Sequence, residues 1–222
     1  RSIASLLMPQ RQPPTLLSTL GLAGYALRHG VKTLQTAITS GQHSDPDGLF
    51  FSGTQPAWSN LQVRQIIRRL GQHCRRIGWI DVHTGLGPYS VGERIYKGRT
   101  DPEDITRARS WWGAQVTTSV DGTSSSAVLD GTLDLGVMQE CPHAQYNGLT
   151  LEFGTKSGPL VLKALSADQW LQNHPDTDEA QRVRIKQQLR DAFYIDTDQW
   201  KQRVLEQARA VSELTRLGLA TP

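Results

Sequence analysis

Cysteine is scarce in this chain: Cys74 and Cys141 are the only two among 222 residues. They lie far apart in the sequence and have none of the short spacings of paired zinc ligands. This excludes a paired-cysteine metal motif and a disulfide-rich secreted scaffold. We therefore expect two reduced thiols and a cytoplasmic protein.

Long apolar runs are also absent. No stretch approaches the ~20 consecutive apolar residues that cross a bilayer, and 37% hydrophobic with 20% charged residues is typical of a globular protein. We expect no membrane partner. The length suits a single domain over residues 1–222 with a sizeable core. Its first 14 residues carry Pro9, Pro13 and Pro14 and are expected to form an extended lead-in.

Several catalytic signatures are missing. The sequence contains no internal repeat, no phosphate-binding P-loop and no serine nucleophile elbow. The histidines are His29, His43, His73, His83, His143 and His174. None of them forms an H-x-x-E or H-x-x-x-H pair, whereas a catalytic zinc normally needs three protein ligands.

Acidic residues are unevenly distributed, with none before Asp45. Residues 1–111 hold 14 Lys and Arg against 7 Asp and Glu, and residues 112–222 hold 10 against 14. A basic half could steer anionic substrates or bind nucleic acid. The densest basic stretch runs from Arg64 to Arg76, but no aromatic residues interleave with it for base stacking. A solvated arginine face is favoured, and we regard nucleic acid as an unlikely partner.

Hydrophobic periodicity predicts an α/β protein with a mostly parallel or mixed sheet flanked by helices. The predicted helices cover Thr15–Thr39, Leu61–Leu70, residues 101–112, residues 159–172, Asp178–Phe193 and Asp198–Leu217. Short apolar runs predict strands at Ile77–Val82, Gly136–Met138 and Leu149–Thr155. The polar segment Thr117–Asp134 is expected as a surface loop or a lid-like insertion.

The stretch from Ile77 to Gly87 holds the first candidate residue. Its apolar run ends at a glycine-rich segment, the pattern of a buried strand in an α/β sheet. Open α/β sheets bind ligands at the carboxyl edge, so His83 is placed for a metal ligand or a general base. A hydrogen-bonded core histidine explains it equally well. Asp81, two residues earlier, faces the same side and could orient a ligand.

A second strand, Leu149–Thr155, carries one carboxylate, Glu152, among apolar residues. A lone buried carboxylate is costly unless it is paired, hydrogen-bonded or beside a metal. We therefore expect His83 and Glu152 on neighbouring strands, with both side chains at the carboxyl edge. Glu93 and Arg94, in the glycine-rich loop expected after His83, are candidates for substrate contacts. An ion pair explains these two residues equally well.

Four motifs stand in a fixed order: Pro46–Phe51, Pro56–Asn60, Trp79–Gly87 and Leu149–Thr155. Together they resemble a bacterial family of unknown function near the carboxypeptidase A-like zinc hydrolases, in the succinylglutamate desuccinylase and aspartoacylase branch. In that superfamily an early H-x-x-E pair and a later histidine on a strand hold zinc, and a glutamate on a following strand activates the zinc-bound water. The resemblance matches His83 to the later histidine and Glu152 to the glutamate.

The early H-x-x-E pair and the Asn-Arg segment that binds substrate carboxylate in that superfamily have no counterpart in this sequence. The resemblance therefore implies the C-terminal part of a zinc-dependent hydrolase that acts on a small-molecule or peptide amide. An absent N-terminal segment or another chain would supply the missing strands and ligands of a carboxypeptidase-like sheet. The alternative is a truncated, metal-free remnant that acts as a binding or structural module. We expect no ordered catalytic zinc on this chain alone.

Overall fold

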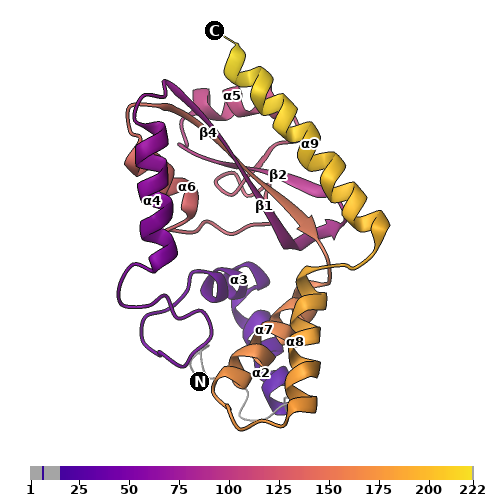
Figure 1. Cartoon of the computed structure of the whole chain (residues 1–222). Helices are drawn as coiled ribbons and strands as arrows, with labels where there is room; N and C mark the ends of the chain where they lie inside the picture. The colour runs from indigo at the N-terminus through magenta and orange to yellow at the C-terminus, as the bar shows by residue number, and fades with distance from the viewer. Residues whose placement is uncertain (1–6, 8–15, 222) are drawn as a thin grey trace. The chain divides into compact units, whose positions relative to one another are not determined.

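The computed structural model describes residue 7 and residues 16–221. The chain divides into two compact units (Figure 1). Unit 1 is formed by Arg1–Gln55 and Lys156–Ile195, and unit 2 by Pro56–Thr155 and Asp196–Pro222. That residues 1–222 form a single domain remains a prediction. Among the helices of the described part, none is long and apolar enough to cross a membrane.

Unit 2 is built on a four-stranded mixed sheet, which confirms the predicted α/β class. Its strands are β1 (Arg76–Tyr89), β2 (Gly92–Lys97), β3 (Thr117–Thr118) and β4 (Gln145–Gly154). Their order across the sheet is β1-β4-β2-β3. Strand β4 runs parallel to β1 and antiparallel to β2, and β2 runs parallel to β3.

Strand β1 is longer and more exposed than the sequence predicts. The expected strand Ile77–Val82 lies within β1, which continues through the glycines to Tyr89. The prediction that this strand is buried is wrong, because β1 is an edge strand in the described sheet and none of residues 76–84 is buried. The predicted strand Leu149–Thr155 is confirmed as part of β4. That strand lies between two neighbours and is buried at every residue after Gln145.

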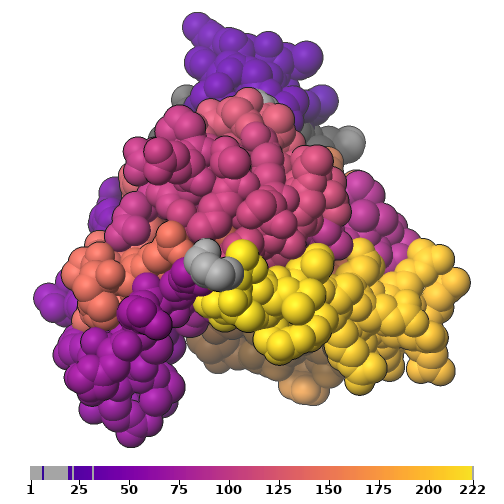
Figure 2. All heavy atoms as spheres, turned by 90° about the horizontal axis from the view of Figure 1, so that it is seen from above, coloured from indigo at the N-terminus to yellow at the C-terminus, as the bar shows by residue number. Residues whose placement is uncertain are grey.

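One face of the sheet is covered by α5 (Pro102–Trp112) and α9 (Asp198–Ala220), as Figure 1 shows. The buried residues of this core are Tyr96, Ala108, Trp112, Val116, Leu149, Leu151, Phe153 and Val211. The three β4 residues among them alternate with Thr150 and Glu152, because successive strand side chains point to opposite faces. The indole Nε1 of Trp112 donates to Thr215 Oγ1 at 2.8 Å, which ties α5 to α9. The outer side of α9 forms part of the molecular surface (Figure 2).

A second core in unit 2 involves α4 (Trp58–Gly71) and α6 (Leu133–Glu140). Its buried members are Ile67, Val137, Cys141, Ala144 and Tyr146. The predicted strand at Gly136–Met138 is wrong, since these residues lie in α6. A three-residue apolar run has no periodicity of its own, so packing against α4 decides the conformation. The amphipathic pattern of α4 predicts a buried stripe of Leu61, Ile66, Ile67 and Leu70, but this is mostly wrong, because only Ile67 is buried.

In unit 1, the predicted helix Thr15–Thr39 is in fact two helices, α2 (Leu16–His29) and α3 (Val31–Thr39). Gly30 separates them with a φ of 87°, in the left-handed region that favours glycine. The helix is predicted from apolar residues that recur at three- and four-residue steps, but several of these residues are exposed. Leu20, Leu27 and Val31 are 65%, 89% and 72% exposed.

The other helices of unit 1 are α7 (Gly158–Gln172) and α8 (Glu179–Phe193), both as predicted. They pack through Ala167, Leu171 and Ile185. Of the expected lead-in over residues 1–14, only Leu7 lies among the described residues, and it is helical and buried.

Candidate functional site

The candidate residues meet in one row across the sheet of unit 2. His83 on β1 is the register partner of Glu152 on β4, and Glu152 is the register partner of Glu93 on β2. Directly opposite residues project to the same face of a sheet. The structure therefore brings three titratable side chains together from three adjacent strands. It places His83 and Glu152 on neighbouring strands, as the sequence predicts.

His83 lies between two carboxylates. Its Nε2 is 3.0 Å from Asp81 Oδ2, and its Nδ1 is 3.7 Å from Glu152 Oε2. The pKa of His83 is raised, chiefly by its hydrogen bond with Asp81. Burial lowers the pKa, the negative charges of Asp81 and Glu152 raise it further, and the positive charge of Lys97 lowers it. The imidazole is 51% exposed, so a ligand can reach it from solvent. An N–H at Nε2 that donates to Asp81 leaves the Nδ1 lone pair facing Glu152.

Glu152 is the more buried member of the pair, with only 11% of its side chain exposed. The backbone N–H of Leu86 donates to its Oε1 at 3.0 Å. The pKa of Glu152 is raised, chiefly by burial. The Leu86 hydrogen bond and the charge of His83 lower the pKa, the charge of Glu93 raises it, and the charge of Lys97 lowers it. A carboxyl with a raised pKa is a stronger base when ionised, which suits proton transfer.

The glycines after His83 place the Leu86 amide. Gly85 and Gly87 have φ angles of 141° and 93°, and the pairing of β1 with β4 shifts register between Gly85 and Tyr89. This bulge approaches β4 so closely that a Cβ on Gly154 would overlap the carbonyl groups of Gly87 and Pro88. The Leu86 contact was not predicted from the sequence, although the two flanking glycines indicate an unusual backbone there.

Glu93 and Arg94 are on strand β2, so the prediction that they lie in a loop is wrong. Alternation along the strand separates them. Glu93 joins the row opposite Glu152, whereas Arg94 donates to the carbonyl of Trp112 in α5. The structure therefore does not bring Arg94 to the site. Among residues 7 and 16–221, no ion pair of Glu93 or Arg94 is found, and Glu93 accepts hydrogen bonds from Thr117 and Ser125 instead.

The described residues do not supply a complete zinc centre. Residue 7 and residues 16–221 contain no group of three His, Cys, Asp or Glu side chains placed to hold one metal ion. The geometry gives the reason: Asp81 and Glu152 face different nitrogens of the His83 ring, so the three side chains do not converge on one point. His83 Nδ1 is a suitable donor for zinc, but a catalytic site normally uses three protein donors.

The basic face of α4 is tied to α6. Arg64 Nη1 lies 2.9 Å from Glu140 Oε1, and Arg68 Nε lies 2.7 Å from Glu140 Oε2. Hydrogen bonds from Arg68 and then Arg64 lower the pKa of Glu140 to about 2. The arginine face is therefore partly neutralised within unit 2. This pairing was not predicted, because the sequence pattern placed Glu140 after a short strand at Gly136–Met138 and not at the end of a helix packed on α4.

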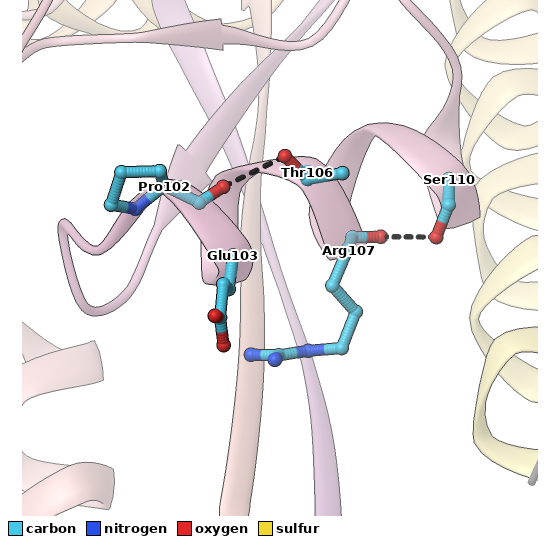
Figure 3. Close-up of a pocket in the computed structure, with 5 residues that line it drawn as sticks. All are labelled: Pro102, Glu103, Thr106, Arg107 and Ser110. Carbon is cyan, nitrogen blue, oxygen red and sulfur yellow. Dashed lines mark hydrogen bonds between the residues drawn. The ribbon is translucent and has the colours of Figure 1, made fainter.

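A shallow depression of about 410 Å³ lies along α5, away from the row. It is lined by Pro102, Glu103, Thr106, Arg107 and Ser110 (Figure 3). The hydroxyls of Thr106 and Ser110 donate to helix carbonyls one turn earlier, at 2.8 and 2.7 Å. Because its lining comes from a single helix and both hydroxyls are already bonded, this depression is a weaker candidate site than the row.

A model of the family described as "Protein of unknown function (DUF2817)" matches residues 1–207. No curated protein and no solved structure matches the chain. None of these findings names a carboxypeptidase or a zinc enzyme, so the relationship to those hydrolases stays a prediction.

Proposed function

The chain belongs to this family of unknown function, and from the geometry of unit 2 we propose that it is a hydrolase of amide or peptide bonds. In this proposal Glu152 is the general base and His83 offers zinc one nitrogen ligand. The observation that supports it is the register pairing of His83 with Glu152, which sets Nδ1 3.7 Å from Oε2. The resemblance to carboxypeptidase A-like hydrolases gives the same two residues these roles.

Glu152 is the group that moves the proton. Its carboxylate takes a proton from the attacking water, and the carboxyl then gives that proton to the leaving nitrogen. The Leu86 N–H holds Oε1 and leaves Oε2 directed towards His83 Nδ1, 3.7 Å away, so Oε2 is the oxygen that takes the proton in this proposal. A base of this kind contributes typically ~10²–10⁴-fold to the rate.

Asp81 orients the imidazole. By accepting from Nε2–H, it fixes the tautomer in which Nδ1 carries the free lone pair. Zinc, when bound, would supply an acidified water and polarise the scissile carbonyl. His83 fills one ligand position, and the remaining donors would come from outside the described cluster, on an N-terminal segment or another chain. The substrate in this proposal is a small-molecule or peptide amide.

Two measurements test the proposal. With the N-terminal segment or partner chain that would supply the remaining donors present, zinc content after reconstitution and desalting is compared between wild type, His83→Ala and His73→Ala. His73 is an exposed histidine of the same unit and serves as a matched control. Hydrolysis of N-acyl amino acids and short peptides is followed by amine release in wild type, Glu152→Gln and the control Glu206→Gln. We expect zinc loss only in His83→Ala and a rate loss of ~10²–10⁴-fold only in Glu152→Gln. Zinc held equally by His83→Ala would contradict the ligand assignment.

A metal-free binding or structural module is the second candidate. It is favoured by the single imidazole in the cluster, since no three donors converge within residues 16–221. A wild-type protein that, with the remaining donors supplied, takes up no zinc after reconstitution and releases no amine from any substrate would favour this candidate over the hydrolase.

A further inference from the structure

Glu93 is a carboxylate opposite another carboxylate. It faces Glu152 across the antiparallel pair β2–β4, and like charges directly opposite each other destabilise a sheet. A position with this cost is expected to have a compensating role. The partners of Glu93 indicate which role that is.

Three hydrogen bonds hold Glu93, all from one segment. Its Oε1 accepts from Thr117 Oγ1 at 2.7 Å and from the Ser125 backbone N–H at 3.0 Å. Its Oε2 accepts from the Ser125 hydroxyl. Glu93 thus fastens both ends of residues 117–125, which we term the hydroxyl loop.

The hydroxyl loop is closed on itself between these two ends. The Ser124 N–H donates to the Thr118 carbonyl at 3.1 Å, and Thr118 N–H donates to Thr123 Oγ1 at 3.0 Å. Thr118 and Ser124 are both buried. The loop is therefore a preformed unit, and Glu93 connects it to the row that contains Glu152.

We propose that Glu93 is a positioning residue that anchors the hydroxyl loop beside Glu152, so that the loop shields Glu152 from bulk water as a flap. The low exposure of the Glu152 side chain, 11%, agrees with a cover on this part of the sheet. The use of such a flap during hydrolysis rests on the proposed function, because a covered base acts in a site from which competing water is excluded. The anchoring itself does not depend on that function.

The test compares Glu93→Ala, Glu93→Gln and Glu206→Gln in the full chain. Glu206 is an exposed glutamate on α9 that bonds only Gln202 among the described residues, so it controls for loss of one surface carboxyl. Amide hydrogen exchange of residues 117–125 measures the anchoring. Carbodiimide-driven labelling of Glu152 with glycine ethyl ester, quantified by mass spectrometry, measures the shielding.

In Glu93→Ala we expect exchange of the loop to accelerate about tenfold or more, the size set by loss of hydrogen bonds to a charged group. Labelling of Glu152 should rise several-fold in the same variant. Glu93→Gln retains an acceptor at Oε1 and should restore both readouts to near wild type, as should Glu206→Gln. If Glu93→Ala does not fold, Ser125→Ala removes one donor from the loop side and provides the same comparison.

The proposal would be overturned if Glu93→Ala showed the same loop exchange rate and the same Glu152 labelling as wild type. If its loop exchanged faster but Glu152 were labelled no more than in wild type, the shielding role would be overturned. Neither readout requires enzymatic activity. A protein that hydrolyses nothing would therefore refute the proposed function and leave the result for Glu93 unaffected.

Discussion

Replacing Gly154 with alanine tests the account of how Glu152 is held. A Cβ at this position would overlap the carbonyl groups of Gly87 and Pro88, which are backbone atoms and cannot rotate away. The bulge or strand β4 must shift, and overpacking of this kind costs about 1–3 kcal/mol of the free energy of unfolding. A shift of the bulge also moves the Leu86 N–H away from Glu152, a hydrogen bond to a charged acceptor worth about 1.5–3 kcal/mol.

The assay is urea unfolding of the chain followed by tryptophan fluorescence, with Gly136→Ala as the matched control. A Cβ on Gly136 meets its nearest atoms, on Arg64, at an ordinary 3.9 Å. Because Gly136 lies inside α6, alanine there should be neutral or stabilise by about 0.5–1 kcal/mol. A free energy of unfolding for Gly154→Ala within about 0.5 kcal/mol of wild type, the size of an ordinary surface substitution, would refute this close packing.

Three further predictions follow from the same unit. Asp81→Asn should lower zinc retention or hydrolytic rate by about 10–100-fold without changing the unfolding midpoint, because Asp81 orients His83; equal zinc retention and activity would refute this role. Glu140→Gln should be less stable than wild type above the unfolded pKa of 4.5, and the difference should vanish as pH falls through the folded pKa of about 2. Urea midpoints at several pH values check this, and a constant difference would contradict it. The chain should not bind duplex or single-stranded DNA at near-physiological salt, because Arg64 and Arg68 are paired with Glu140; micromolar binding with steep salt dependence in a fluorescence anisotropy titration would contradict this.

Strand β4 could be predicted from the sequence because its strict alternation of apolar and polar residues is typical of a strand and not of a helix. Leu149, Leu151 and Phe153 alternate with Thr150 and Glu152, and the structure places the first three in a core and Glu152 in the row. The helices α8 and α9 were also predicted to within a few residues. Asp178 and Thr197 cap them by accepting from backbone N–H groups, a local signal that does not depend on tertiary packing.

Other elements depend on contacts that the sequence does not reveal. Gly136–Met138 is too short to show a period, so its helical state follows from packing of Val137 against α4. Strand β2, which carries Glu93, was predicted as part of a loop because the glycines of this stretch, including Gly92, are poor strand formers. A Cβ on Gly92 would lie 2.8 Å from Leu151 Cδ1 and 3.0 Å from the Phe153 ring, so a larger residue there would require these side chains to shift.

The candidate site was predictable only in part for the same reason. Strand pattern and titratable residues indicated that His83 and Glu152 share a sheet edge, and Asp81 followed from the two-residue strand period. Glu93 needed the register of β2 against β4, and Leu86 needed the bulge, neither of which is encoded in local sequence spacing.

A double-mutant cycle on His83 and Glu152 tests the central claim most directly. Hydrolysis rates are measured for wild type, His83→Ala, Glu152→Gln and the double variant, with circular dichroism to show that all four are folded. Residues that act as one unit give strongly non-additive losses. We predict that the double variant is about as slow as the slower single variant. Losses that multiply, so that the double variant shows the product of the two single effects, would contradict a shared site.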